Sequence, residues 1–272
     1  MLTTPHEARR SLVARIGAVF ERRELLLALT HREVQVRYKQ AVLGMAWAVF
    51  MPLSLMAVFT LVRRGSAPRD DGLPYAVWSY CGLLAWTLHQ TALKGCVGTL
   101  VTNRNLLQKV YFPRELFPLA KIGAALVDFG VGLVVLAAVM AWNGVPFHAS
   151  MALLPVVVAV HLMLLAGAGL LLSAANLFFR DVQYIFDVLL LVWMFASPVF
   201  LDTAGKVVVG GVDVFAVFNP MYPILEGYRD VLLRGGLRQP EHFALGAAVS
   251  ALVFVLGLAF FAKAEPKFAE RA

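Results

Sequence analysis

The side chains that most often perform catalysis are scattered along this 272-residue sequence. No HExxH, CxxC or GxSxG motif is present, so neither a zinc-protease site nor a serine nucleophile elbow is expected. The one Gly-Lys pair, Gly205-Lys206, precedes Val207 and lacks the hydroxyl that binds Mg²⁺ in a Walker A loop. No metal-ligand spacing occurs among the histidines, which are His6, His31, His89, His148, His161 and His242. We expect no catalytic residue and no metal site, so energy for any work must come from a partner or a gradient.

Composition indicates an integral membrane protein. Hydrophobic residues make up 60% of the sequence and charged residues 15%, whereas a soluble domain averages roughly 45–50% and about 25%. This balance excludes an ordinary soluble enzyme, a disordered chain and a fibrous protein. Cys81 and Cys96 share one hydrophobic stretch and would lie roughly 22 Å apart on a helix, too far for a disulfide.

Six apolar stretches are the elements that must position any functional residue, and each is expected to be a membrane-spanning helix. They cover residues 41–62, 74–93, 116–141, 151–178, 184–201 and 242–262, close to the roughly 20 residues that a span needs. Lysine and arginine are more frequent in the segments that a cytoplasmic N-terminus places inside, so both termini are expected in the cytoplasm. The net charge of +7 is then topological, and no nucleic-acid partner is expected.

Residues 1–40 are expected to form an amphipathic helix on the membrane surface. Val13, Ile16, Phe20 and Leu27 fall on one helical face, and the polar face is mostly arginine. Such a face suits anionic lipid. A plain cytosolic helix is the alternative.

Two connections are too long to be simple turns. Residues 94–115 lie on the cytoplasmic side of this topology and residues 202–241 lie outside. The apolar piece of the outer connection is too short to cross the membrane, so we expect a re-entrant or interfacial pair of short helices there. No internal repeat is visible, so residues 1–272 are expected to form one membrane domain, with 263–272 as a cytoplasmic tail.

Four sequence segments, in this order, resemble the permease subunit of polysaccharide-exporting ABC transporters. The resemblance is carried by RYKQAVLGMAW from Arg37 followed by Pro52, by NLLQKVYFPRE over 105–115, by FRDV over 179–182 with Ser197-Pro198, and by Asn219-Pro220 with Glu226, Tyr228, Arg229 and the C-terminal Phe268-Ala269-Glu270. Ala41 stands where the family usually has Ser.

This resemblance implies an all-α permease of six transmembrane helices in the bacterial cytoplasmic (inner) membrane. The family exports lipid-linked glycans such as O-antigen, teichoic acid or capsule, as a homodimer with two separate ATPase subunits. ATP and Mg²⁺ would bind those partners, and this chain would carry no cofactor. The resemblance also implies an interfacial N-terminal helix, a coupling helix in the first long cytoplasmic loop and periplasmic re-entrant helices.

The coupling helix is expected within residues 103–115, where polar side chains alternate with apolar ones that could enter a cleft. The candidate contacts to the ATPase are Asn103, Arg104, Leu106, Lys109, Phe112, Pro113, Arg114 and Glu115. The alternative is a solvated loop whose charge serves topology alone.

Arg37, Tyr38 and Lys39 lie at the cytoplasmic end of the first span and could bind the pyrophosphate of a lipid carrier. An ordinary positive-inside anchor explains them equally well.

Aromatic rings could line the substrate channel, because the CH faces of sugars pack on aromatic rings. The candidates are Trp47, Phe50, Phe59, Trp193 and Phe195, of which Trp47 and Trp193 are preferred. Lipid-facing or packing rings are the alternative.

Two further features concern packing inside the membrane. Asp128 lies near the middle of the third span, where charge is costly. A relaxed ion pair with Lys121 or a neutral, hydrogen-bonded carboxyl would each explain it. Gly167 and Gly169, together with Ala166 and Ala174, give the fourth span a face for close helix contact.

The leading hypothesis is therefore the permease of an ATP-driven polysaccharide exporter. An ABC permease for a drug or lipid shares the six-span plan. A membrane-embedded enzyme acting on lipid-linked sugars would need clustered acids, bases or nucleophiles, which the sequence does not show at either interface. A secondary transporter would be expected to carry repeats and more intramembrane charge.

Overall fold

The computed structural model describes residues 12–39, 44, 46–63, 71–104, 113–200, 208–209, 212–213 and 219–268. Its helices are α1 (Leu12–Glu21), α2 (Arg23–Tyr38), α3 (Ala46–Val62), α4 (Tyr75–Thr102), α6 (Leu116–Trp142), η1 (Ala149–Leu153), α7 (Leu154–Phe178), α8 (Asp181–Phe195), α10 (Met221–Leu233), α11 (Pro240–Ala264) and η2 (Glu265–Lys267). Two-residue strands, β1 (Val208–Val209) and β2 (Val212–Asp213), pair antiparallel. Apart from this hairpin the described chain consists of helices joined by turns and short irregular segments, which confirms the all-α class.

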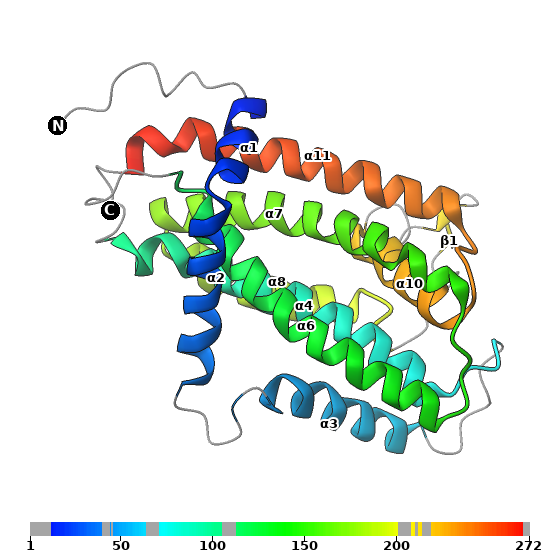
Figure 1. Ribbon diagram of the computed structural model, residues 1–272. Coiled ribbons are helices and arrows are strands. Elements are labelled where there is room, and N and C mark those ends of the chain that lie inside the picture. The colour runs from blue at the N-terminus through cyan, green and yellow to red at the C-terminus, as the bar shows by residue number, and fades with distance from the viewer. Residues whose placement is uncertain are drawn as a thin grey trace.

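The long helices lie alongside one another in a bundle (Figure 1). α4 packs against α6 and α7, and α7 packs against α11. α1 and α2 run across the bundle near the end where α7 and α11 finish, whereas α10 and β1 lie at the opposite end. We call these the terminal end and the α10 end.

Within the described residues, three helical segments are long and apolar enough to cross a membrane: Leu116–Trp142, Ala149–Phe178 and Pro240–Lys267. They correspond to the third, fourth and sixth expected spans. α3 has 17 residues and α8 has 15, which rise roughly 26 and 22 Å against a hydrocarbon layer of about 30 Å. The complete six-span topology stays a prediction.

α4 is the central helix of the bundle. Every residue from 77 to 86 is buried, so this part of α4 faces protein on all sides. The helix continues past the expected end of the second span, because Cys96, Val97 and Leu100 extend its buried apolar surface. The expected connection 94–115 is therefore shorter than predicted, since residues 94–102 are helical.

The fifth expected span, 184–201, starts and ends earlier than predicted. α8 begins at Asp181 and stops at Phe195, and residues 196–199 form turns. Pro198 accounts for the early end, because a proline disfavours helical geometry in the residue before it.

The outer connection contains one short helix in the part that the structure describes. This helix, α10, is almost entirely buried, and it lies at the α10 end together with β1 (Figure 1). The expected pair of re-entrant helices stays a prediction.

α1 and α2 occupy the segment that was expected to be amphipathic. Ile16 packs against a small apolar cluster at the terminal end, whereas Phe20 and Leu27 are exposed. The side chain of Val13 lies outside the described residues. The apolar face is thus only partly covered by the chain itself, and its contact with lipid stays a prediction.

α7 and α11 cross at two glycines, which confirms the small-residue face expected around Gly167. A Cβ atom on Gly167 would meet the carbonyl oxygen of Val253, and one on Gly257 would meet the carbonyl oxygen of Gly167. Gly169 faces α4, where a Cβ atom would lie 2.8 Å from Cys96 Sγ. At the crossing of α7 and α11 the two backbones are in direct contact, so no residue larger than glycine fits there.

Substituting Gly257→Ala is expected to destabilise the bundle by about 1–3 kcal/mol, because the added methyl group forces two backbones apart. Gly130→Ala is the matched control, since a Cβ there meets nothing within 4 Å and alanine favours the helix. Denaturant unfolding in detergent micelles, followed by circular dichroism, measures both variants. An equal loss in both would contradict the close crossing.

Candidate functional site

The predicted head-group residues lie at the end of α2, where two of them contact α6. The guanidinium of Arg37 and the hydroxyl of Tyr38 donate to opposite oxygens of the Asp128 carboxylate, the latter at 2.7 Å. Burial and the neighbouring Asp128 raise the pKa of Tyr38 to about 12, so its hydroxyl stays protonated and acts as a donor. Lys39, the C-cap of α2, is exposed.

A second ion pair lies farther back along α2. Lys121 Nζ pairs with Glu33, and a Cβ atom on Gly123 would lie 2.8 Å from Thr30 Oγ1. Lys121 and Asp128 therefore have separate partners in α2, which replaces the Lys121–Asp128 ion pair considered from the sequence. The sequence indicates this arrangement through the order of charges. In α2 the acid Glu33 precedes the base Arg37, whereas in α6 the base Lys121 precedes the acid Asp128, so the two helices carry opposite charges in the same order. We call this contact the α2–α6 seam.

The five candidate channel aromatics fall into two groups. Trp47 and Phe50 on α3 are 43% and 53% exposed and meet edge to face with centroids 5.6 Å apart, and Phe195 on α8 is 58% exposed. Phe59 instead stacks on Phe200 with ring centroids 4.0 Å apart. The first three rings are thus available at the surface of the chain, whereas Phe59 is partly buried and packs against the core.

Trp193, the other preferred aromatic, is tied to the start of α10. Its Nε1 donates to Asn219 Oδ1 at 2.7 Å. The Asn219 amide nitrogen donates in turn to Ala196 O at 3.0 Å and to Ser197 Oγ at 2.9 Å. This contact gives Ser197-Pro198 and Asn219-Pro220 a shared structural role, because it joins the end of α8 to α10.

A buried polar chain next to Trp193 is not apparent from the sequence. His89 Nδ1 lies 3.2 Å from His161 Nε2, and His161 Nδ1 lies 3.3 Å from the Tyr228 hydroxyl. Both histidines are fully buried, and the Trp193 ring meets His89 edge-on at a centroid distance of 4.8 Å. These contacts link α4, α7 and α10 in the core and hold Trp193 against α4.

The two ends of the predicted coupling segment are described, whereas Leu106, Lys109 and Phe112 lie outside the described residues. Asn103 and Arg104 follow α4, and the Asn103 side-chain oxygen accepts a hydrogen bond from Arg32 at 2.9 Å. Pro113 and the two residues after it lead into α6. The first end thus contacts α2.

The second end of that segment contacts α1 and the C-terminal segment. Arg15 Nη1 lies 2.7 Å from carboxylate oxygens of both Glu115 and Glu265. Arg114 donates to the Glu265 carbonyl at 2.8 Å, and its guanidinium lies 5.8 Å from the centroid of the buried Phe268 ring. Burial and the Glu265 charge raise the pKa of Glu115 above its ordinary value.

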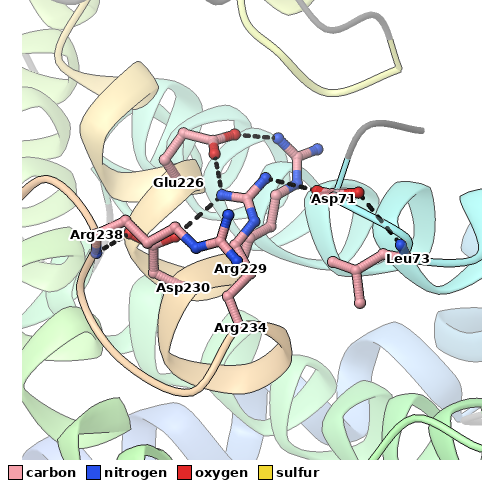
Figure 2. A network of polar contacts seen from close by, with 7 residues as sticks. All are labelled: Asp71, Leu73, Glu226, Arg229, Asp230, Arg234 and Arg238. Atoms are coloured by element: carbon pink, nitrogen blue, oxygen red, sulfur yellow. Dashed lines mark hydrogen bonds and ion pairs between the residues drawn. The ribbon is translucent and has the colours of Figure 1, made fainter.

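A charged network ties down the α10 end (Figure 2). Arg234 Nη1 lies 2.6 Å from Glu226 and 3.0 Å from Asp230, and its Nη2 lies 3.1 Å from Asp71, which precedes α4. The Arg238 backbone N–H donates to Asp230 at 2.8 Å. The network therefore fixes α10 both internally and to the segment between α3 and α4.

Arg229 is the fully buried member of this network. Its Nη1 lies 2.6 Å from Glu226, its Nη2 donates to Val199 O at 3.2 Å, and its guanidinium lies 3.6 Å from the centroid of the Trp78 ring. A Cβ atom on Gly82 would collide with this guanidinium, so glycine leaves the space that Arg229 needs. The signal in the sequence was the run of opposite charges three and four residues apart on one helix face.

Replacing Arg15 with methionine is expected to lower the free energy of unfolding by about 3–5 kcal/mol at pH 8, because the buried carboxylate of Glu115 and the partly exposed one of Glu265 lose their shared cation. The loss should be smaller at pH 5. Arg15 opposes the rise in the pKa of Glu115, so the pKa of this carboxyl rises further when Arg15 is replaced. A carboxyl with a raised pKa in the folded state loses stability as pH rises from its unfolded to its folded pKa, so the variant loses more at pH 8 than at pH 5.

Unfolding of the purified chain in detergent at both pH values measures this effect. Arg22→Met changes an exposed arginine between α1 and α2 and serves as the control. A loss at Arg15 that does not depend on pH would contradict the role of Glu115.

Replacing Arg229 with methionine is expected to destabilise the chain by about 3 kcal/mol or more, because Glu226 loses a buried partner. Arg229→Lys should fall between methionine and wild type, since an ammonium keeps the charge but not the planar contact with Trp78. Arg238→Ala removes an exposed side chain but keeps the backbone N–H that joins the network, so it should change stability by less than about 0.5 kcal/mol. Thermal unfolding in detergent compares the three variants, and similar losses in all of them would refute a specific role for Arg229.

Comparison with known proteins places the chain in a family. The sequence pattern of the family described as ABC-2 type transporter matches residues 24–233. The O-antigen export system permease protein RfbA of Myxococcus xanthus is 29% identical over 95% of this chain and 99% of its own length. A protein of the same name from Klebsiella pneumoniae is 24% identical over 94% of this chain and 96% of its own length. Because the family match covers most of the chain, this protein belongs to the ABC-2 type transporter family.

Proposed function

We propose that this chain is the permease subunit of an ATP-driven exporter that moves a lipid-linked polysaccharide across the bacterial cytoplasmic membrane. The observation that carries the proposal is its similarity, over almost the full length of both chains, to relatives named as O-antigen export permeases. The exported class is therefore a glycan of the O-antigen type. A lipid carrier is proposed because a long hydrophilic polymer needs an anchor to approach the permease from the membrane.

Six helices form the proposed transmembrane unit, namely α3, α4, α6, α7, α8 and α11. Successive members run in opposite directions along the bundle, and the first and last described helices, α1 and η2, lie at the terminal end (Figure 1). This arrangement supports a topology in which the terminal end is cytoplasmic and α10 lies on the outer side. It agrees with the distribution of lysine and arginine in the sequence.

A separate ATPase is the proposed source of energy, and ATP and Mg²⁺ bind to that partner. The sequence of this chain contains no Walker A motif, which supports the division of labour. Residues 103–115 form the proposed contact. Arg15 and Arg114 join the end of this segment to α1 and η2. A displacement of the segment by the ATPase would therefore be passed to α1, α6 and η2.

A homodimer is the proposed functional unit, with the substrate path between two copies. α3 and α8 support this proposal, because each exposes a long apolar face that the rest of the described chain leaves uncovered. The exposed residues on α8 are Tyr184, Ile185, Val188, Leu189, Leu191, Val192 and Phe195. Trp47, Phe50 and Phe195 would present rings to sugar faces along that path.

The proposed head-group site is formed by Arg37, Tyr38 and Lys39. A diphosphate carries at least two negative charges, and an arginine fork together with a protonated phenol can donate to its oxygens. Lys39 is exposed next to them and would add a second cation.

The test is purification of the tagged chain from its native membrane in mild detergent, followed by mass spectrometry and an ATPase assay. We expect a stoichiometric second subunit that contains a Walker A motif and hydrolyses ATP. Cells that lack the chain should accumulate full-length polysaccharide on the cytoplasmic side of the membrane and should lose it from the cell surface. Recovery of the chain alone, without ATPase activity, together with normal surface polysaccharide in the deletion strain, would refute the proposal.

A further inference from the structure

We propose that Asp128 is an internal competitor for the phosphate of the substrate head group. When no substrate is bound, the Asp128 carboxylate accepts hydrogen bonds from Arg37 and Tyr38. When substrate binds, a phosphate group takes these hydrogen bonds in its place. The proposal rests on the head-group role given above to Arg37, Tyr38 and Lys39, and it adds how that site is kept closed and then opened.

The geometry of the α2–α6 seam supports an exchange of one anion for another. Arg37 and Tyr38 are adjacent in α2, and their donors converge on the two oxygens of a single carboxylate. A phosphate offers the same kind of acceptor with more oxygens and more charge, so it can take both hydrogen bonds at once. Asp128 thus holds the place that a phosphate would occupy.

The pair is also accessible from one side. The side chain of Arg37 is 28% exposed, whereas that of Asp128 is 12% exposed. An incoming anion therefore meets the guanidinium before it meets the carboxylate. The exposed Lys39 lies next to this opening and would draw a phosphate toward it.

Exchange has a mechanical consequence, because Asp128 lies in α6 and its two donors lie in α2. Once a phosphate holds Arg37 and Tyr38, nothing in this contact keeps the end of α2 on α6. The second seam pair, Glu33–Lys121, lies farther back along α2 and is not displaced. The last turn of α2 is then free to move while its middle stays anchored, and α3 follows shortly after in the chain.

The seam offers its own control for this idea. Glu33–Lys121 and Arg37–Asp128 are both ion pairs between the same two helices. If ion pairing served only to hold the helices together, loss of either acid would have the same effect on ligand binding. If Asp128 competes with phosphate, only its loss favours binding.

The experiment measures equilibrium binding of radiolabelled farnesyl diphosphate to the full-length chain in detergent micelles. Asp128→Asn is expected to bind about tenfold more tightly than wild type, because the neutral amide competes poorly for Arg37. Arg37→Ala is expected to weaken binding about tenfold, alone and combined with Asp128→Asn. Glu33→Gln should leave the affinity unchanged.

Each contrary result overturns a defined part of the argument. If Asp128→Asn binds no more tightly while Arg37→Ala weakens binding, the competitor role is wrong and the head-group site stands. If Glu33→Gln tightens binding as much as Asp128→Asn, a loosened seam explains the effect and the competitor role is again wrong. If Arg37→Ala has no effect in either background, the proposed head-group site itself fails.

Inorganic pyrophosphate separates a lipid head group from a free phosphate as the occupant. It is expected to bind much more weakly than farnesyl diphosphate, and equal affinity would overturn the lipid as the source of the phosphate. A further measurement needs no variant and does not depend on the folding of Asp128→Asn. Amide hydrogen exchange at residues 36–39 of the wild-type chain, in the last turn of α2, should rise when farnesyl diphosphate is added, and an unchanged or lower rate would overturn the replacement of Asp128 by phosphate.

Discussion

An ionised side chain inside an apolar helix bundle needs a partner, because an isolated charge at membrane depth costs several kcal/mol. This chain has few charges, and the structure pairs several of them between segments that are far apart in sequence. Arg15 joins Glu115 to Glu265, Arg37 pairs with Asp128, and Arg234 reaches Asp71. Apolar surfaces alone would let neighbouring helices slide in lipid, so these polar contacts fix which turn of one helix meets which turn of the next.

The close glycine crossing and the ion pairs lie in different parts of the bundle. Between α7 and α11 the contact is made by Gly167 and Gly257, where backbones touch and no alternative side-chain arrangement exists. At the terminal end, along the α2–α6 seam and at the α10 end, the contacts include ion pairs and hydrogen bonds. A close glycine crossing resists deformation, whereas an ion pair can exchange one partner for another of the same charge. The elements free to change their contacts are therefore at the ends of the bundle and at α2, around a fixed centre.

The sequence was sufficient to predict the helices whose length and apolar character follow from the lipid environment. The third, fourth and sixth spans follow from apolar length, since a helix in hydrocarbon must satisfy its own backbone. α4 was predicted too short because its last turns are covered by protein, where polar residues such as Asn103 find partners in the chain. The pairing of Arg37 with Asp128 could not be read from either segment by itself, because it depends on where α2 crosses α6. The same holds for His89 and His161, which are 72 positions apart and looked unrelated.

α8 and α10 are held together at two points, and this determines how movement can pass along the chain. Asn219 hydrogen-bonds Trp193 and Ser197 near the end of α8, and Arg229 donates a hydrogen bond to the carbonyl of Val199 just beyond it. If α8 shifts along its axis, these hydrogen bonds must therefore either break or move α10 with it. Arg234 pairs with Asp71 ahead of α4, so α8, which has a long uncovered apolar face, is connected through buried polar contacts to the central helix of the bundle.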